Sequence, residues 1–358
     1  PDTISMRAGE AISLLLRVTV FEDAMGDGVA APGVVARLVS QPTIFDAAQD
    51  TITIGYVPGT RYVAANGAVD NSNCTNLNNP CATLQHAINQ ALDGDDILLS
   101  LGTYTDFVTR TVGIEVVQQN AFVDKDVSVI GGYNAGDGYA SFQPITNSVT
   151  LDGQGSRRVF YIDAGTDVTL MGLFMVNGRH PDFGGAIYHV DGNLTILGSW
   201  IRNSRAQYGA GLYHADGTLT VNSSVFDANV ANNTSNTQPG EGAGIHIAAG
   251  TVVLENNTFA ENRNEITSIA PDSTGNGGAI FQATGNITLL NNIFAFNTAS
   301  GQGAAYYIVS PTVNIVDNDY SLFFDNGLNY ANVPTGTNSF IADPLFIDSY
   351  YHLNESSP

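Results

Sequence analysis

The chain has 358 residues, of which 43% are hydrophobic and only 13% are charged, and its formal charge is −22. A chain of this length and composition can bury a large core in one domain or two. The negative charge reflects scarce bases, because Lys125 is the only lysine and eleven arginines accompany it. Such a surface repels nucleic-acid phosphates and anionic membranes, so we expect neither as a partner.

The chain shows no candidate for a membrane-spanning helix, since Arg17 interrupts the longest apolar stretch, Ala11 to Val20. A span needs about 18 or more consecutive apolar residues. There is also no charged-then-apolar signal peptide, and the start at Pro1 is typical of a trimmed piece of a longer protein. The 38 glycines and 13 prolines predict many turns rather than long helices.

Residues 1–58 differ in pattern from the rest. Strands are expected at Ile12–Val20, Val34–Val39 and Thr51–Ile54, separated by turns rich in Gly, Pro and Ala. Three strands are too few for a complete sandwich domain. The segment is therefore either part of an immunoglobulin-like module or a set of strands that completes a neighbouring sheet, and both alternatives stay open.

The second domain is expected at residues 59–358 and opens with the only two cysteines, Cys74 and Cys81. We expect them to form a disulfide, which fits an oxidising extracellular setting. The alternative is two unpaired thiols, which alone make a poor metal site. A helix is expected after Asn79-Pro80, with Asn79 as its cap and one apolar stripe that covers the end of the following strands.

Three motifs recur along the rest of the chain. The first is an aromatic residue followed three positions later by asparagine, and its pairs are Phe174 and Asn177, Trp200 and Asn203, Phe226 and Asn229, Phe259 and Asn262, Phe294 and Asn297, and Phe323 and Asn326. The second is a small-residue corner before an apolar residue, as in Gly184-Gly-Ala-Ile187. The third is a short strand-like run, as in Leu194-Thr-Ile196.

Repeats of this kind, with three short strands each and no helices, predict an all-β fold, a right-handed parallel β-helix with an N-terminal capping helix. Equivalent residues of successive coils lie about 4.8 Å apart, so the six aromatic residues and the six asparagines should form inward columns. Early coils are expected at Val112–Val117, Val127–Ile130 and Val149–Leu151. A β-propeller would need longer repeats of four strands, and a leucine-rich repeat would need more leucine.

The corner and aromatic-x-x-Asn motifs resemble the repeats of the polymorphic outer-membrane-protein family and, more broadly, bacterial surface and secreted β-helix proteins. The stretch from Tyr62 to Tyr104 is similar to the usual start of such proteins, and Asp343-Pro-Leu-Phe346 with Tyr351-His-Leu353 is similar to their usual end. The resemblance covers roughly residues 60 to 358. It implies surface display with an adhesive or structural role, and it transfers no catalytic residue.

Many β-helix proteins cleave polysaccharides, so an enzyme of this kind would be expected to carry their motifs. Polygalacturonase-like hydrolases share Asn-Thr-Asp, Asp-Asp, Gly-His-Gly and Arg-Ile-Lys, but here only Asp95-Asp96 stands out, at the end of the expected helix. Arg179-His180-Pro-Asp182 is the best local acid–base candidate, and a polar corner loop is the alternative. No catalytic residue is assigned, although a polysaccharide lyase or glycoside hydrolase remains the alternative function.

One further column is expected on the outer face of the coils, at the position after the inward residues Val159, Ile187, Leu212, Ile245, Ile280 and Tyr306. Its members are Phe160, Tyr188, Tyr213, His246, Phe281 and Tyr307. Strand alternation points these rings outward, where they bind sugar faces or a partner protein, or merely stabilise the sheet by stacking on one another.

One residue further on stand His189 and His214, near Asp163, Asp191 and Asp216. Alternation places both histidines inside, which favours neutral stacked imidazoles over a metal site, so no metal is assigned. The aspartates favour turns before glycine, and weak Ca²⁺ binding at that edge stays open. We expect no other cofactor.

Together these features predict an extracellular or cell-surface structural or adhesive β-helix, a module of a larger fibre or envelope assembly. The expected partners are other copies of the chain, other surface proteins or glycans. Carbohydrate-active or carbohydrate-binding function is the alternative.

Overall fold

The structure is a computed structural model that describes residues 58–65, 68–232, 239–265, 274–309, 314–331, 336 and 338–358, and the backbone of strands at 33–37 and 45–49. The chain divides into two units, Pro1–Val57 and Pro58–Pro358. In the first unit, β1 (Gly33–Arg37) pairs antiparallel with β2 (Phe45–Gln49). β1 agrees with the strand expected at Val34–Val39, whereas the strands expected at Ile12–Val20 and Thr51–Ile54 lie outside the described residues.

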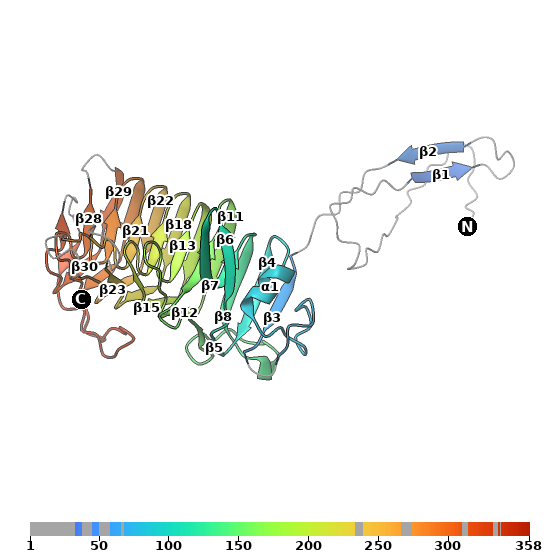
Figure 1. The fold of residues 1–358 in the computed structure, drawn as a ribbon, viewed down its shortest axis with the longest axis horizontal. Helices are drawn as coiled ribbons and strands as arrows, with labels where there is room; N and C mark the ends of the chain where they lie inside the picture. The colour runs from blue at the N-terminus through green and yellow to red at the C-terminus, as the bar shows by residue number, and fades with distance from the viewer. Residues whose placement is uncertain are drawn as a thin grey trace. The chain divides into compact units, whose positions relative to one another are not determined.

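The second unit is a right-handed parallel β-helix, as predicted (Figure 1). Three sheets of nine strands each run along the stack. Sheet 1 contains β3 (Thr60–Val63), β4 (Asp95–Ser100), β8 (Val127–Tyr133), β11 (Thr166–Met171), β14 (Gly192–Leu197), β18 (Thr218–Asn222), β22 (Thr251–Glu255), β26 (Asn286–Leu290) and β29 (Asn314–Asp319). Sheet 2 contains β5 (Gly102–Tyr104), β9 (Val149–Asp152), β12 (Leu173–Val176), β15 (Trp200–Arg202), β19 (Val225–Asp227), β23 (Thr258–Ala260), β27 (Ile293–Ala295), β30 (Leu322–Phe324) and β32 (Phe340–Ile341).

Sheet 3 carries the face discussed below. It contains β6 (Val108–Val112), β7 (Glu115–Val123), β10 (Arg158–Ile162), β13 (Ile187–His189), β17 (Leu212–His214), β21 (Ile245–Ile247), β25 (Ile280–Gln282), β28 (Tyr306–Ile308) and β31 (Tyr330–Ala331). A short fourth sheet, β16 (Arg205–Ala206), β20 (Val230–Ala231) and β24 (Arg263–Asn264), lines the corner between sheets 2 and 3.

Strand alternation builds the core. In sheet 1, Leu170, Ile196, Val221, Leu254 and Leu289 face each other in register and are buried. Burying each such side chain contributes about 1.5–3 kcal/mol. Because every coil repeats the arrangement, the core runs through the stack as one cluster.

The phenylalanine column is confirmed in four coils and wrong in two. Phe226, Phe259, Phe294 and Phe323 stack at ring-centroid distances of 5.1, 5.0 and 5.1 Å. Phe174 and Trp200 instead pair with each other and with Val225, one position earlier, and point out of sheet 2. Met175 and Ile201 take the core positions there.

The asparagine column divides at the same place. Asn229, Asn262, Asn297 and Asn326 form a ladder in which each Nδ2 donates to the next Oδ1 at 2.9–3.0 Å, and all but the half-buried Asn326 are buried. Asn177 and Asn203 are not in that ladder: the backbone N–H of Gly178 donates to the Ser204 hydroxyl, and that of Ser204 to Asn229 Oδ1. A hydroxyl thus replaces the amide, and Asn177 and Asn203 lie outside the coil with left-handed backbone.

The N-terminal end of the core is covered by α1 (Leu84–Gln90), whose Leu84, Ala87 and Ile88 are buried. The helix begins later than expected, and its cap is Thr83, whose hydroxyl accepts from His86 N, rather than Asn79. The reason is that Cys81 pairs with Val63 and keeps the chain extended up to that point. The predicted Cys74–Cys81 disulfide is present, beneath this cap.

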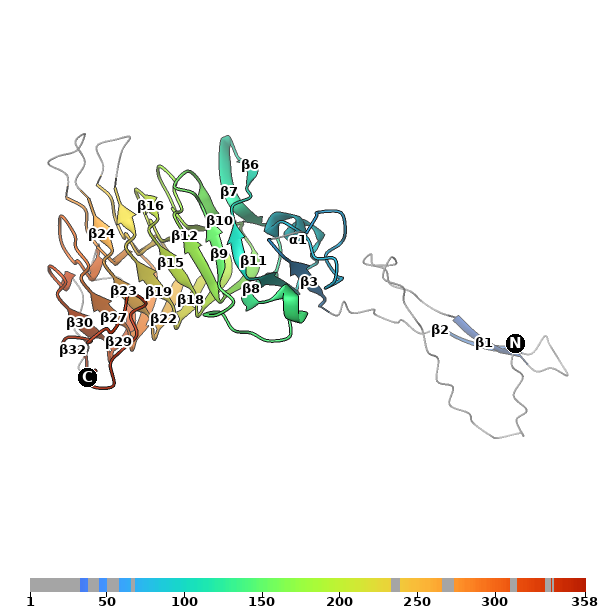
Figure 2. The same ribbon diagram turned by 90° about the horizontal axis from the view of Figure 1, so that it is seen from below.

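The expected strand at Val112–Val117 is wrong, because a turn at Gly113 and Ile114 divides it. β6 and β7 form an antiparallel hairpin that projects beyond the stack (Figure 2). The strands expected at Val127–Ile130 and Val149–Leu151 are confirmed as β8 and β9.

The C-terminal segment packs back onto sheet 2. Tyr350 lies edge-on against Trp200 at 5.1 Å, and the Tyr351 hydroxyl donates to Asp227 Oδ1 at 2.7 Å. Asp227 is buried and also pairs with Arg202 Nε at 2.9 Å. The segment is therefore fastened by a hydrogen bond to a buried carboxylate.

Replacing Tyr351 by phenylalanine should lower the free energy of unfolding by about 2 kcal/mol, because a buried carboxylate loses a donor. Urea unfolding of the full chain measures this. Tyr350→Phe is the matched control, since Tyr350 is 55% exposed, and it should change stability by no more than about 0.5 kcal/mol. Equal effects of the two variants would show that the Tyr351 hydroxyl does not hold the segment.

Candidate functional site

The outer face of sheet 3 carries a continuous column of aromatic rings. The column runs Phe122, Tyr161, Tyr188, Tyr213, His246, Phe281 and Tyr307, with centroids 4.8–5.4 Å apart. Five of the six expected members are therefore correct. Phe160 is not one of them: it is fully buried, pairs with Ile187 and faces the core together with Val159. The cause is a bulge, since the N–H groups of Val159 and Phe160 both donate to Ala186 O.

These rings are stacked face to face along the helix axis, with interplanar angles between 2° and 31°. Each internal ring therefore has both faces occupied by its neighbours. Only ring edges and tyrosine hydroxyls remain for a ligand, whereas a sugar that stacks on an aromatic ring needs a free face. The geometry thus favours the stabilising interpretation of this column over sugar stacking.

Beside the column lies a buried guanidinium. Arg158 is 2% exposed, and its Nε and Nη2 donate to Phe183 O at 3.1 and 2.8 Å. Its Cζ lies 5.1 Å from the Tyr188 ring centroid. Burial lowers the pKa of Arg158 to about 10. Arg158 thus fixes the corner at Phe183 against the tyrosines, and burial raises the pKa of Tyr213, further along the column, to about 12.

The acid–base candidate at Arg179 to Asp182 has its histidine fully engaged. His180 Nε2 lies 3.0 Å from Glu115 Oε1 at the hairpin tip, and Nδ1 accepts from the N–H groups of Asp182 and Phe183 at 3.2 Å. This pattern requires the neutral Nε2–H tautomer. Burial, followed by the charge of Arg158, lowers the pKa of His180 to about 3. The imidazole therefore fastens the hairpin to the corner, and the polar corner-loop interpretation fits better than a general base.

His189 and His214 lie inside the coil, as expected, with their rings stacked at 5.0 Å. They bond to each other through Nδ1 atoms 2.8 Å apart. Burial, and for His214 also the neighbouring imidazole, lowers the pKa to about 4 for His189 and about 3 for His214. Two nitrogens bonded to each other cannot both ligate one ion, so this pair does not fit a metal site.

Other potential ligands for ions are also engaged. Asp191 and Asp216 each accept from the N–H of the following glycine, which supports the turn interpretation of these aspartates. Cys74, Cys81 and His86 come within 4.8 Å of one another, but the disulfide occupies both sulfurs. Weak Ca²⁺ binding at the turn edge stays a prediction.

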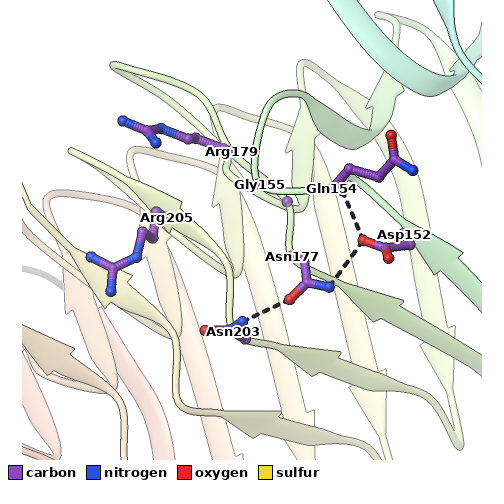
Figure 3. Close-up of a pocket in the computed structure, with 8 residues that line it drawn as sticks. Asp152, Gln154, Gly155, Asn177, Arg179, Asn203 and Arg205 are labelled. Carbon is purple, nitrogen blue, oxygen red and sulfur yellow. Dashed lines mark hydrogen bonds between the residues drawn. The ribbon is translucent and has the colours of Figure 1, made fainter. Parts of the chain in front are cut away.

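A polar groove lies at the corner after sheet 2, on the coils of β9, β12 and β15, with a volume of about 470 Å³ (Figure 3). Asn177 Nδ2 donates to Asp152 Oδ1 at 3.0 Å, and Asn203 Nδ2 donates to Asn177 Oδ1 at 2.6 Å. Gln154, Gly155, Gly178, Arg179 and Arg205 complete the lining. Both arginine side chains extend away from Asp152 (Figure 3).

Sequence reasoning missed two features of functional weight. The first is this groove. The short corner loops that follow Asn177 and Asn203 were the feature of the sequence that could have indicated it. The second is Glu241, which follows Phe183 and Tyr208 in a corner column. Burial raises the pKa of Glu241 to about 7. An isolated glutamate in a corner loop carried no signal in the sequence alone.

No protein-family model, curated protein or solved structure matches the chain. Within the part of the chain that the structure describes, no helix is long and apolar enough to cross a membrane.

Proposed function

We propose that the chain is an extracellular or cell-surface β-helix with a structural and adhesive role, whose binding contacts lie along its side. The observation that carries this proposal is the self-stacked column on sheet 3, whose rings stiffen the solenoid instead of forming a cleft. The disulfide at the N-terminal cap supports an oxidising compartment. Continuous buried ladders support a rigid rod, since each coil bonds to the next at every strand.

Adhesion tests this role directly. Beads coated with the full chain should be retained on at least one surface among a panel of immobilised polysaccharides and a layer of the protein itself. Beads coated with albumin are the control and should not be retained. Retention no greater than that of albumin on every surface would overturn the adhesive role.

A carbohydrate-active role is the second candidate, and one observation favours it. Glu241, with its pKa raised by burial to about 7, keeps its proton on about half of the molecules at neutral pH, and a general acid needs such a retained proton. Incubating the purified chain with the same polysaccharides separates the two roles. Release of reducing or unsaturated sugar ends, lost in Glu241→Gln, would establish the enzyme; retention on a surface without release supports the adhesive role.

A further inference from the structure

The groove of Figure 3 has an excess of positive charge on a strongly negative chain. Arg179 and Arg205 are paired across adjacent coils, which places their backbones about 4.8 Å apart. Arg179 is exposed and has no carboxylate partner among the described residues. Among the carboxylates of the described residues, Arg205 contacts Glu265 at a long 3.4 Å, and Arg263 binds the same carboxylate more closely at 3.0 Å. Two like charges on adjacent coils repel each other, and an anion bound between them would relieve that repulsion.

The single acid of the groove does not supply that anion. Asp152 accepts from Asn177 Nδ2 and from the backbone N–H of Gln154 at 2.7 Å. These bonds hold it on the far side of the groove from the guanidinium groups (Figure 3). Arg179 therefore stays available to a ligand, and Arg205 is held by its 3.4 Å contact to Glu265.

The two asparagines are displayed here and nowhere else along the described corner. Their left-handed position is occupied in the following coils by Ala228, Glu261, Phe296 and Asp325, so the backbone does not require asparagine there. The inward ladder does not require them either, because Ser204 serves in it. Asn203 ends the chain of bonds, and its Oδ1 stays available as an acceptor among the described residues.

We infer that this groove binds an acidic saccharide, with Arg179 and Arg205 gripping a sugar carboxylate and Asn177 and Asn203 bonding its hydroxyls. The guanidinium fork matches a planar carboxylate with two parallel hydrogen bonds. Carboxamides both donate and accept, as sugar hydroxyls do. The lining contains no apolar side chain, which disfavours a peptide with hydrophobic anchors. The inference rests on the proposed adhesive role and names its ligand class.

Calorimetric titration of the full chain with short galacturonic acid oligomers tests the site, and galactose oligomers supply the uncharged comparison. The acidic oligomers should bind and the neutral ones should not, and binding should weaken as salt is raised. The double variant Arg179→Gln, Arg205→Gln should bind at least about tenfold more weakly. Arg110→Gln, on the hairpin strand β6, removes one positive charge outside the groove and should stay within about twofold.

Glycine at the displayed positions isolates the amides, because glycine accepts left-handed backbone without strain. Asn177→Gly with Asn203→Gly should weaken binding about threefold or more while leaving the thermal midpoint close to that of the parent. If the double arginine variant fails to fold, Arg179→Gln alone provides the charge test, since this side chain is exposed.

Three results would overturn the site: no binding of the acidic oligomers, equal binding of the neutral ones, or equal binding by the arginine double variant and Arg110→Gln. The bead assay is independent of these three results. Retention of coated beads on neutral polysaccharide or on the protein itself would then show that adhesion is real and that this groove is not its origin.

Discussion

Replacing Asn262 by leucine is expected to lower the free energy of unfolding by about 4 kcal/mol, the largest single effect in the ladder. Asn262 is fully buried, and its Nδ2 donates to Phe226 O at 2.9 Å and to Asn297 Oδ1. Its Oδ1 accepts from the backbone N–H of Asn229. Leucine has a similar size but no polar atom, so the Asn229 N–H is left unpaired in the core, and the side chains of Asn229 and Asn297 each lose a hydrogen bond. Each such group costs about 1–3 kcal/mol.

Urea unfolding of the full chain measures the loss. Asn193→Ala is the control, because its amide bonds only to Asp167 on the surface. It should change stability by less than about 0.5 kcal/mol. If Asn262→Leu were as stable as Asn193→Ala, the buried amide ladder would contribute nothing to the stack.

The architecture was predictable because the fold repeats its signals. Corner glycines, strand-like runs and aromatic-x-x-Asn motifs recur in one order, and each solenoid coil needs all three. The helix and the disulfide were predictable for a local reason, namely a short cysteine loop followed by an apolar stripe. The corner loops differ from coil to coil and carry no periodic signal. The groove and the environment of Glu241 could therefore not be predicted from the sequence.

The register errors have a simple physical origin. In the coils from β11 to β27, a core position lies five residues after the last inward residue of sheet 1, as in Leu170 to Met175, Ile196 to Ile201 and Val221 to Phe226. Phe174 and Trp200 lie four residues after that inward residue, so strand alternation points them outward. Aligning coils on their aromatic residues hides this difference, whereas counting from the strand would have exposed it.

The same count locates a ladder that the motifs did not show. Two residues before each core position stands a serine or asparagine whose side chain accepts from the preceding coil: Ser199, Ser224, Asn257, Asn292 and Ser321. Because this ladder contains serine in some coils and asparagine in others, it does not show as a sequence motif. Hydroxyl and amide oxygens satisfy the same backbone N–H, which is why the fold accepts either.

The fold and the candidate groove are linked through this interchange. The inner ladder holds Gly178 and Ser204 in the two coils that carry Arg179 and Arg205, and in these coils asparagine occupies the preceding surface position instead. The binding surface thus arises where the repeat departs from its own pattern. In the outer column, His246 stands where the neighbouring coils have Tyr213 and Phe281. Because an imidazole can be protonated, we expect this position to make the stack sensitive to acid.

Lowering the pH from 6.5 toward 4 is expected to destabilise the β-helix. Burial lowers the pKa of His189 to about 4 and of His180, His214 and His246 to about 3, from 6.5 in the unfolded chain. The unfolded state therefore binds more protons in this window, and stability falls as pH falls. Each histidine accounts for about 1.4 kcal/mol per pH unit, or about 2 kcal/mol at pH 5.

Glu241 acts in the opposite sense. Burial raises its pKa from 4.5 to about 7, so the folded state holds its proton more tightly and stability falls as pH rises from 4.5 to 7. Between pH 7 and pH 5 the carboxyl regains about 3 kcal/mol, against about 8 kcal/mol lost at His180, His189, His214 and His246 together. The net expectation is a loss of about 5 kcal/mol at pH 5.

Unfolding free energies measured by urea titration from pH 8 to pH 4 test both groups. His246→Phe continues the ring column as Phe281 does and removes one titrating group, so its loss on acidification should be smaller by about 2 kcal/mol at pH 5. Glu241→Gln should make the loss steeper. His352→Gln, whose side chain is 56% exposed, should follow the parent. If His246→Phe lost as much unfolding free energy on acidification as the parent, protonation of His246 would not contribute to the acid sensitivity.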